Sequence, residues 1–198
     1  MRETLFHTRN RKEQALIITH DREKLLNTLA YFINNTSWYG KTKLFKLLYF
    51  LDFEHFKETG RSVTGLDYFA WEMGPVPAAL QNEIDNPESD FSESFDIDIK
   101  PANRGKIIYL IPKIRFDPTH FTRRELRLLR ELASRYDLAT AGEMVEQTHL
   151  ETQPWHQVWE VEQRRFERIP YEYALSTEER EYIESITTER LEVINNYS

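Results

Sequence analysis

The pattern of apolar positions is densest in residues 41–60, where it predicts a helix that is buried on most of its surface. At about 100° per residue, leucine and aromatic side chains cover most of the circumference and leave a narrow polar stripe of Lys46, Glu54 and Lys57. A helix with so little polar surface packs inside a domain. We therefore expect the rest of the fold to be arranged around it.

Two polar residues, Asp52 and His55, fall inside the apolar arc of this helix, and a spacing of three makes them neighbours. A buried carboxylate needs hydrogen bonds or a cation to offset its desolvation. We expect a structural role, in which Asp52 contacts the backbone of the following loop or Arg61. The alternative is a functional site that includes an enzyme built on Asp52 and His55.

The N-terminal part of the chain contains one further predicted helix. Asp21 is a suitable N-cap, and the apolar residues that follow share one face as far as residue 34, which predicts a helix over about residues 22–34. Residues 1–21 mix basic residues with a short apolar run, and their pattern fits an arm, a strand or an extra helix.

The middle of the chain has the composition of strands and turns. Residues 63–71 are rich in β-branched and aromatic side chains and predict a strand, and Gly74 before Pro75 predicts a tight turn. A short helix is expected over residues 77–84, because proline is well tolerated in the first turn. The polar, acidic residues 86–94 predict a surface loop.

A β-hairpin is predicted next. Phe95, Ile97 and Ile99 alternate with acidic residues, and a turn leads into residues 106–111. Together with the strand of residues 63–71, the hairpin would make a small sheet of three strands.

The C-terminal half is predicted to be helical because its helix caps are well marked. Threonine or serine precedes glutamate by three positions at three places, which predicts capping boxes at Thr122, Thr140 and Ser176. Pro154 opens another helix and Pro170 ends it. The fold class is therefore α+β and mainly α-helical: a helical bundle with a small antiparallel three-stranded sheet.

Composition limits the possible classes of protein. With 198 residues, of which 40% are hydrophobic, the chain can bury the core of one domain with appendages. It has no cysteine, which fits a reducing, cytoplasmic setting, and no apolar run indicates a signal peptide or a membrane span. The net charge of −7 argues against general nucleic-acid binding and fits a basic partner.

Candidate chemistry is sparse. Gly40-Lys41-Thr42 is similar to the end of a P-loop, but the first glycine of that motif would fall at Asn35 and no strand precedes it. We interpret this segment as the start of a helix. The chain also has no G-x-S-x-G motif and no histidine paired with a nucleophile, so no hydrolytic machinery is indicated.

Metal binding was considered at two places, His55 with Glu58, and His149 with Glu151 and His156. Neither has the H-E-x-x-H spacing, and no third ligand is evident. We expect structural histidines and neither a metal nor a cofactor.

An arginine stripe gives the best case for DNA binding. Arg123, Arg127 and Arg130 fall on one face of a predicted helix, and the capped helix that follows would complete a pair similar to a helix-turn-helix. The second helix carries Glu143 and Glu146 where residues that read bases are expected. A solvated face or a protein-docking stripe is the favoured interpretation, with a DNA-binding autoregulator as the alternative.

Aromatic residues at the ends of predicted elements are candidate anchors for a protein partner. Trp38, Tyr39, Trp71 and Trp155 lie beside glycine or proline, where aromatic side chains are often partly exposed. Most of the other aromatic residues are expected in the core.

The sequence resembles the Panacea domain, the SocA-like antitoxin family of bacterial and phage toxin–antitoxin operons. The family pattern has an L-L-Y-F-x-D helix, a T-G strand start, G-P-V-P, and a helical part that ends in T-H and P-W. The matching residues stand in that order at Leu47 to Asp52, Thr64-Gly65, Gly74 to Pro77, Thr148-His149 and Pro154-Trp155. The resemblance covers roughly residues 22–160.

The resemblance implies a domain that is not an enzyme and that neutralises a cognate toxin by direct binding, or delivers the toxin to a protease. Residues 1–21 would then be an N-terminal arm, 22–160 the Panacea-like domain and 161–198 a C-terminal helical extension. The identity of the toxin and the number of copies that assemble, including a homo-oligomer, stay open.

Two sets of site residues follow from these considerations. The partner-binding set is Trp71, Gly74, Pro75, Val76, Pro77 and Trp155, and the structural polar core is Asp52, His55, Thr64 and His149. Asp52 is expected to hold the adjoining loop in shape, and the Gly74–Pro77 turn is expected to meet the partner.

Overall fold

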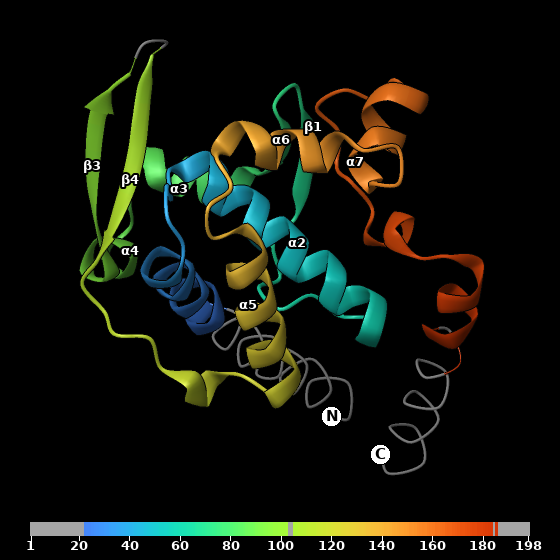
Figure 1. The fold of residues 1–198 in the computed structure, drawn as a ribbon, viewed down its shortest axis with the longest axis horizontal. Helices are drawn as coiled ribbons and strands as arrows, with labels where there is room; N and C mark the ends of the chain where they lie inside the picture. The colour runs from blue at the N-terminus through green and yellow to red at the C-terminus, as the bar shows by residue number, and fades with distance from the viewer. Residues whose placement is uncertain (1–21, 103–104, 184, 186–198) are drawn as a thin grey trace, which may run out of the picture.

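A computed structural model describes residues 22–102, 105–183 and 185. The fold is mainly helical with two small sheets, as the α+β prediction requires, and its central element is α2 (Lys41–Thr59), around which the other elements are arranged (Figure 1). The proposed arm of residues 1–21 and the end of the proposed C-terminal extension, residues 186–198, lie outside the described residues.

The predicted buried helix is α2, and most of its side chains are buried. It ends at Gly60, whose φ of 70° lies in the left-handed region and whose N–H donates to the carbonyl oxygen of Phe56 at 2.8 Å. Glycine adopts this conformation without a Cβ clash, which explains the helix end. The predicted polar stripe is wrong for Lys46, which is buried, and Lys43 is buried on the same helix.

Helix α5 (Arg123–Tyr136) packs against α2, and an ion pair joins it to the first helix, residues 22–35. Lys24 Nζ lies 2.6 Å from Glu125 Oε1, and both residues are buried. Glu125 also closes the capping box with Thr122, so one carboxylate fixes the start of α5 and its contact with a distant helix.

The structure confirms the other two predicted caps. Helix α6 (Ala141–His149) begins with a capping box of Thr140 and Glu143. Ser176 and Glu179 exchange hydrogen bonds of the same type at the start of the helix that begins at residue 177. These caps are local, so sequence spacing alone predicts them.

The prediction of one three-stranded sheet is wrong. Strand β1 (Tyr68–Trp71) pairs with β2 (Gly74–Pro77), and β3 (Phe95–Pro101) pairs with β4 (Lys106–Pro112), so two separate antiparallel hairpins form. The first strand begins at residue 68 instead of 63, because Val63 and Thr64 hydrogen-bond to Asp52.

The predicted tight turn at Gly74-Pro75 is also wrong, since these residues belong to β2. Pro75 and Pro77 have restricted φ values that are compatible with a strand, and Pro77 biases the preceding Val76 toward the β region. Proline is compatible with an edge strand, and the turn between β1 and β2 consists of Glu72 and Met73.

Short helices follow β2. Helix α3 (Ala78–Asp85) matches the prediction for residues 77–84 within one residue at each end. The predicted surface loop of residues 86–94 instead contains α4 (Ser89–Ser94), because Phe91 is fully buried and packs against Phe95 with ring centroids 5.2 Å apart.

The C-terminal region is less regular than predicted. A 3-10 turn η1 (Pro118–His120) precedes α5, and α7 (Pro154–His156) continues as the π-helix η2 (Gln157–Val161) before a 3-10 helix η3 (Tyr171–Ala174). The predicted helix from Pro154 to Pro170 thus ends at Val161. The following residues extend along β1, where the Phe166 and Ile169 N–H groups donate to Ala70 O at 2.8 Å and Tyr68 O at 2.7 Å.

Candidate partner-binding surface and its polar core

Asp52 lies fully buried on α2 and holds the loop that follows the helix. Its carboxylate accepts hydrogen bonds from the N–H groups of Val63 (2.7 Å) and Thr64 (2.8 Å), from the Tyr68 hydroxyl (2.8 Å) and from the Thr64 hydroxyl. Burial raises the pKa of Asp52 to about 6, and the four donors act in the opposite direction. The partners are the loop backbone and two hydroxyls instead of the Arg61 side chain.

His55 contacts the same loop one turn later. Its Nδ1 lies 2.7 Å from the carbonyl oxygen of Arg61, which requires the proton on Nδ1, and 3.2 Å from Thr59 Oγ1. Burial lowers the pKa of His55. Asp52 and His55 therefore fix successive parts of one loop, an arrangement that favours the structural interpretation over an active site.

Lys46 is the polar-core residue that sequence reasoning missed. Its side chain is buried and Nζ donates to the carbonyl oxygen of Pro75 at 2.8 Å, and burial lowers its pKa to about 7. The Gly-Pro-Val-Pro sequence contains a usable signal, because carbonyls beside prolines in an edge strand have fewer backbone partners and need another donor.

Gly74 packs closely against the side chains of Lys46 and Thr148. Its φ is 89°, and a Cβ at this position would lie 2.6 Å from Thr148 Oγ1 and 2.8 Å from Lys46 Nζ. Both approaches are too close for any side chain, so glycine is required for backbone conformation and for packing. Gly74, Lys46 and Thr148 thus bring β2, α2 and α6 together.

The side chains of Trp155 and His149 stack on each other close to β1. The Trp155 Nε1–H donates to the Trp71 carbonyl oxygen at 2.9 Å, and the His149 ring stacks on the indole with centroids 3.7 Å apart and planes 5° apart. Trp155 is buried, as are Gly74, Pro75, Val76 and Pro77. In this conformation these five members of the predicted partner-binding set are buried and are not presented to a partner.

The sixth member, Trp71, is exposed by 38% and lies beside other exposed apolar side chains. Met73 in the β1–β2 turn is 60% exposed and Phe166 is 63% exposed. The Phe166 ring lies 6.4 Å from that of Trp71 and 5.6 Å from that of Trp159, in edge-to-face geometry. The exposed residues Trp71, Met73 and Phe166 are hereafter the Trp71 surface, and the buried Trp159 packs against Phe166.

Phe166 is held outward by its backbone. Its φ of 63° is in the left-handed region, which a bulky side chain rarely adopts, and its N–H bonds to Ala70 in β1. The Arg165 guanidinium lies 5.1 Å above the Trp159 ring, a cation–π contact at the margin of the surface. No local sequence pattern marks Phe166 as part of this surface, because Trp71 and Phe166 lie nearly a hundred residues apart in the chain.

One member of the arginine stripe, Arg127, is paired with carboxylates of the chain, as is the neighbouring Arg124. Arg127 binds Glu58 at 2.7 Å and Glu131 at 2.9 Å, and Arg124 lies 3.1 Å from Glu58. The Arg130 Nε–H donates to the Leu126 carbonyl oxygen at 3.0 Å. Arginines already paired with carboxylates are poor phosphate ligands, so this arrangement does not favour the DNA-binding alternative.

Within the described part of the chain, His149, Glu151 and His156 do not come together as a group of metal ligands. Three carboxylates, Glu83, Glu88 and Asp90, do approach one another within 4.8 Å there. Arg22 of the first helix binds Asp90 at 2.7 Å and Glu83 at 2.8 Å, so the group is used to attach that helix.

These features define a mainly helical α+β domain with a buried polar core and an exposed aromatic surface at Trp71. Residues 44–156 match the family described as antitoxin SocA-like, Panacea domain, and this is more than half of the chain. The chain therefore belongs to the SocA-like antitoxin Panacea family, as the sequence motifs predicted. No curated protein and no solved structure matches it. Within the described residues, no helix is long and apolar enough to cross a membrane.

Proposed function

We propose that this protein is a non-enzymatic antitoxin that neutralises a cognate toxin by direct protein–protein binding through the Trp71 surface. The observation that carries the proposal is the exposed group of Trp71, Met73 and Phe166 on a domain of the antitoxin family. Exposed aromatic residues supported by packed neighbours are the usual anchors of protein interfaces.

The support beneath this surface fits binding better than catalysis. Lys46, Asp52, His55 and Trp155 are polar or amphipathic groups, and all of them are buried and hydrogen-bonded to backbone atoms. Lys46 and Trp155 position the β1–β2 hairpin, Asp52 and His55 position the loop before it, and these buried groups are not accessible to a substrate. A rigid hairpin loses little conformational entropy on binding, which favours affinity.

The negative net charge of the chain favours a partner with a positive net charge. A net charge of −7 favours encounter with a basic toxin, because opposite charges raise the association rate. The toxin is expected to present an apolar patch for Trp71 and Phe166 with lysine or arginine around it.

Co-expression with the adjacent open reading frame tests the proposal. The neighbour should be toxic when expressed alone, harmless when expressed together with this chain, and recovered in a complex with it. If neither adjacent gene is toxic, the antitoxin assignment fails. If the toxin is removed by proteolysis instead of accumulating in the complex, the chain acts as an adaptor and direct neutralisation is wrong.

A matched pair of variants locates the binding surface. Phe166→Asn removes an exposed ring at φ 63°, and Trp38→Asn removes another at φ 58° outside the Trp71 surface. Asparagine tolerates the left-handed region, so both variants should fold. Phe166→Asn is expected to weaken toxin binding at least about tenfold, with Trp38→Asn close to wild type. If Trp38→Asn weakens toxin binding and Phe166→Asn does not, the toxin does not bind at the Trp71 surface.

A further inference from the structure

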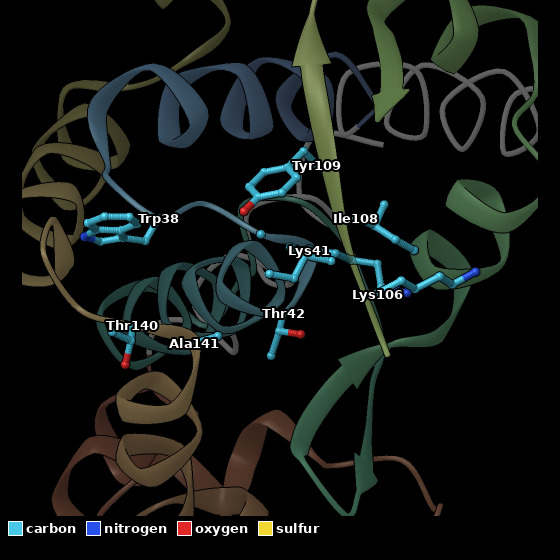
Figure 2. Close-up of a pocket in the computed structure, with 10 residues that line it drawn as sticks. Trp38, Lys41, Thr42, Lys106, Ile108, Tyr109, Thr140 and Ala141 are labelled. Atoms are coloured by element: carbon cyan, nitrogen blue, oxygen red, sulfur yellow. The ribbon is translucent and has the colours of Figure 1, made fainter. Parts of the chain in front are cut away.

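A second exposed aromatic region lies at the start of α2. A hollow of about 350 Å³ is bounded by Trp38, the first residues of α2, strand β4 and the start of α6 (Figure 2). A second hollow of about 230 Å³ shares Trp38 and Tyr109 and reaches Ile111. The two hollows form one groove along β4, here named the Trp38 groove, with Trp38, Lys41, Lys106, Ile107, Tyr109 and Ile111 as its main residues.

The wall of the groove is apolar because of the alternation in β4. Ile107, Tyr109 and Ile111 are two residues apart and so point to one face, and Ile107 and Ile111 are exposed. The opposite face of the strand carries Ile108 and Leu110, which are buried in the core. The exposed side chains of Ile107 and Ile111 therefore do not contribute to the core of the domain.

Trp38 is held in the groove by a well-defined backbone. It is 70% exposed with φ at 58°, in the left-handed region. On one side, the N–H and hydroxyl of Ser37 donate to Asp137 Oδ1 at 2.8 and 2.9 Å, and on the other the Gly40 N–H donates to the Trp38 carbonyl oxygen at 3.0 Å. A strained residue with an exposed indole on so fixed a loop indicates a functional position.

The rim of the groove is basic although the chain is acidic. Lys41 and Lys106 both line the first hollow, and within the described residues no carboxylate lies within 4.0 Å of either amine. The Lys41 amine donates to Gln81 at 2.8 Å. Lys100 and Asp98 both line the second hollow and lie 3.5 Å apart, so among the described residues the unpaired positive charge of the rim is that of Lys41 and Lys106. The lysines on this rim would be stabilised by an anionic partner.

We propose that the Trp38 groove is a docking site for an acidic peptide segment that carries a bulky apolar side chain. The apolar side chain would lie between Trp38 and Tyr109, and acidic residues on either side would meet Lys41, Lys106 and Lys100. A peptide fits better than a compact anion because the two hollows follow the strand, and an extended chain places alternate side chains along such a groove.

This docking site is separate from the surface proposed for the toxin. Figure 1 shows the β3–β4 hairpin at the left edge of the molecule, away from β1 and α7. The chain would thus hold one partner at the Trp71 surface and a different, acidic one at the Trp38 groove. The inference does not depend on the toxin, because it can be tested on the purified chain alone.

Fluorescence anisotropy with a designed probe tests the proposal. The probe is a fluorescein-labelled peptide with a central tryptophan–leucine pair and two glutamates on each side. Wild-type protein should bind it more weakly as salt rises, and Trp38→Asn and Lys106→Glu should each weaken binding at least about tenfold. Phe166→Asn and Lys57→Glu, which lie outside the groove, should bind like wild type. Thermal melting checks that all four variants are folded.

Several results would overturn the proposal. One is equal affinity of wild type and Trp38→Asn, or no binding by either. Another is equal affinity for a probe with glycines in place of the tryptophan–leucine pair, which would show that charge alone acts. A third is a wild-type dimer that Trp38→Asn converts to a monomer in light scattering, because the occupant would then be a second copy of the chain.

Discussion

Asp52 and Lys46 are buried ionisable residues on the same helix, and each is bound to a different strand or loop. Asp52 accepts four hydrogen bonds from residues 63–68, and Lys46 donates one to Pro75. A buried polar group that loses its partner retains the full cost of desolvation, so these contacts specify where the loop and β2 lie.

Asp52→Ala should lower the free energy of unfolding by about 3 kcal/mol, because it leaves two backbone N–H groups and two hydroxyls without their acceptor. Asp52→Asn should lower it by only about 1 kcal/mol, since the hydroxyls of Thr64 and Tyr68 can turn and accept from the amide. Urea unfolding at neutral pH measures both. An Asp52→Asn variant with wild-type stability but lost toxin neutralisation would instead assign Asp52 a direct role.

Lys46 should make stability depend on pH. Its pKa is about 7 in the folded protein, against about 10.4 in an unfolded chain. Between these values the unfolded chain binds the proton and the folded protein does not, so stability rises with pH. The free energy of unfolding of wild type should therefore increase relative to Lys46→Met from neutral pH to about pH 10. A constant difference between the two proteins would show that the buried amine stays charged.

At the scale of elements, β1 is completed by a segment from the far end of the chain. The Ala70 N–H donates to the Glu167 carbonyl oxygen at 2.9 Å, and Phe166 and Ile169 donate back to β1. Farther along, Tyr171 stacks on Phe53 of α2 with centroids 4.4 Å apart. A domain boundary at residue 160 would separate segments that pair with each other.

Truncation tests whether residues 22–160 fold alone. A chain that ends at residue 160 should melt at a lower temperature than the full chain or become insoluble, because it exposes the edge of β1 and leaves the Phe53 ring uncovered. A chain that ends at residue 175 keeps β1 pairing and η3, and it should melt close to wild type. Equal melting temperatures for the two truncated chains would support the predicted boundary at residue 160.

At the scale of the whole molecule, both aromatic surfaces contain an exposed aromatic residue with a left-handed backbone. Trp38 and Phe166 are both strongly exposed, and both have a left-handed backbone pinned by hydrogen bonds to the rest of the fold. The two surfaces differ in their charge, since lysines surround Trp38 in a chain with a net charge of −7. The asparagine variants at these positions serve as reciprocal controls and distinguish failure of one proposal from failure of the other.

The sequence by itself determined the features that depend on neighbours along the chain. Apolar periodicity predicted α2, threonine and glutamate at a spacing of three predicted the caps of α5 and α6, and alternation predicted the β3–β4 hairpin. The ordered short motifs predicted the family. Each of these signals is contained in a short stretch, so the rest of the fold does not need to be known.

Only the tertiary structure decided how distant segments meet. The separation of the strands into two hairpins, the burial of Lys46 under Gly74, and the joining of Trp71 with Phe166 depend on contacts between residues far apart in sequence. The Gly74–Pro77 segment illustrates the difference. Its composition predicted a tight turn, but contacts with α2 and α6 hold it as the buried strand β2.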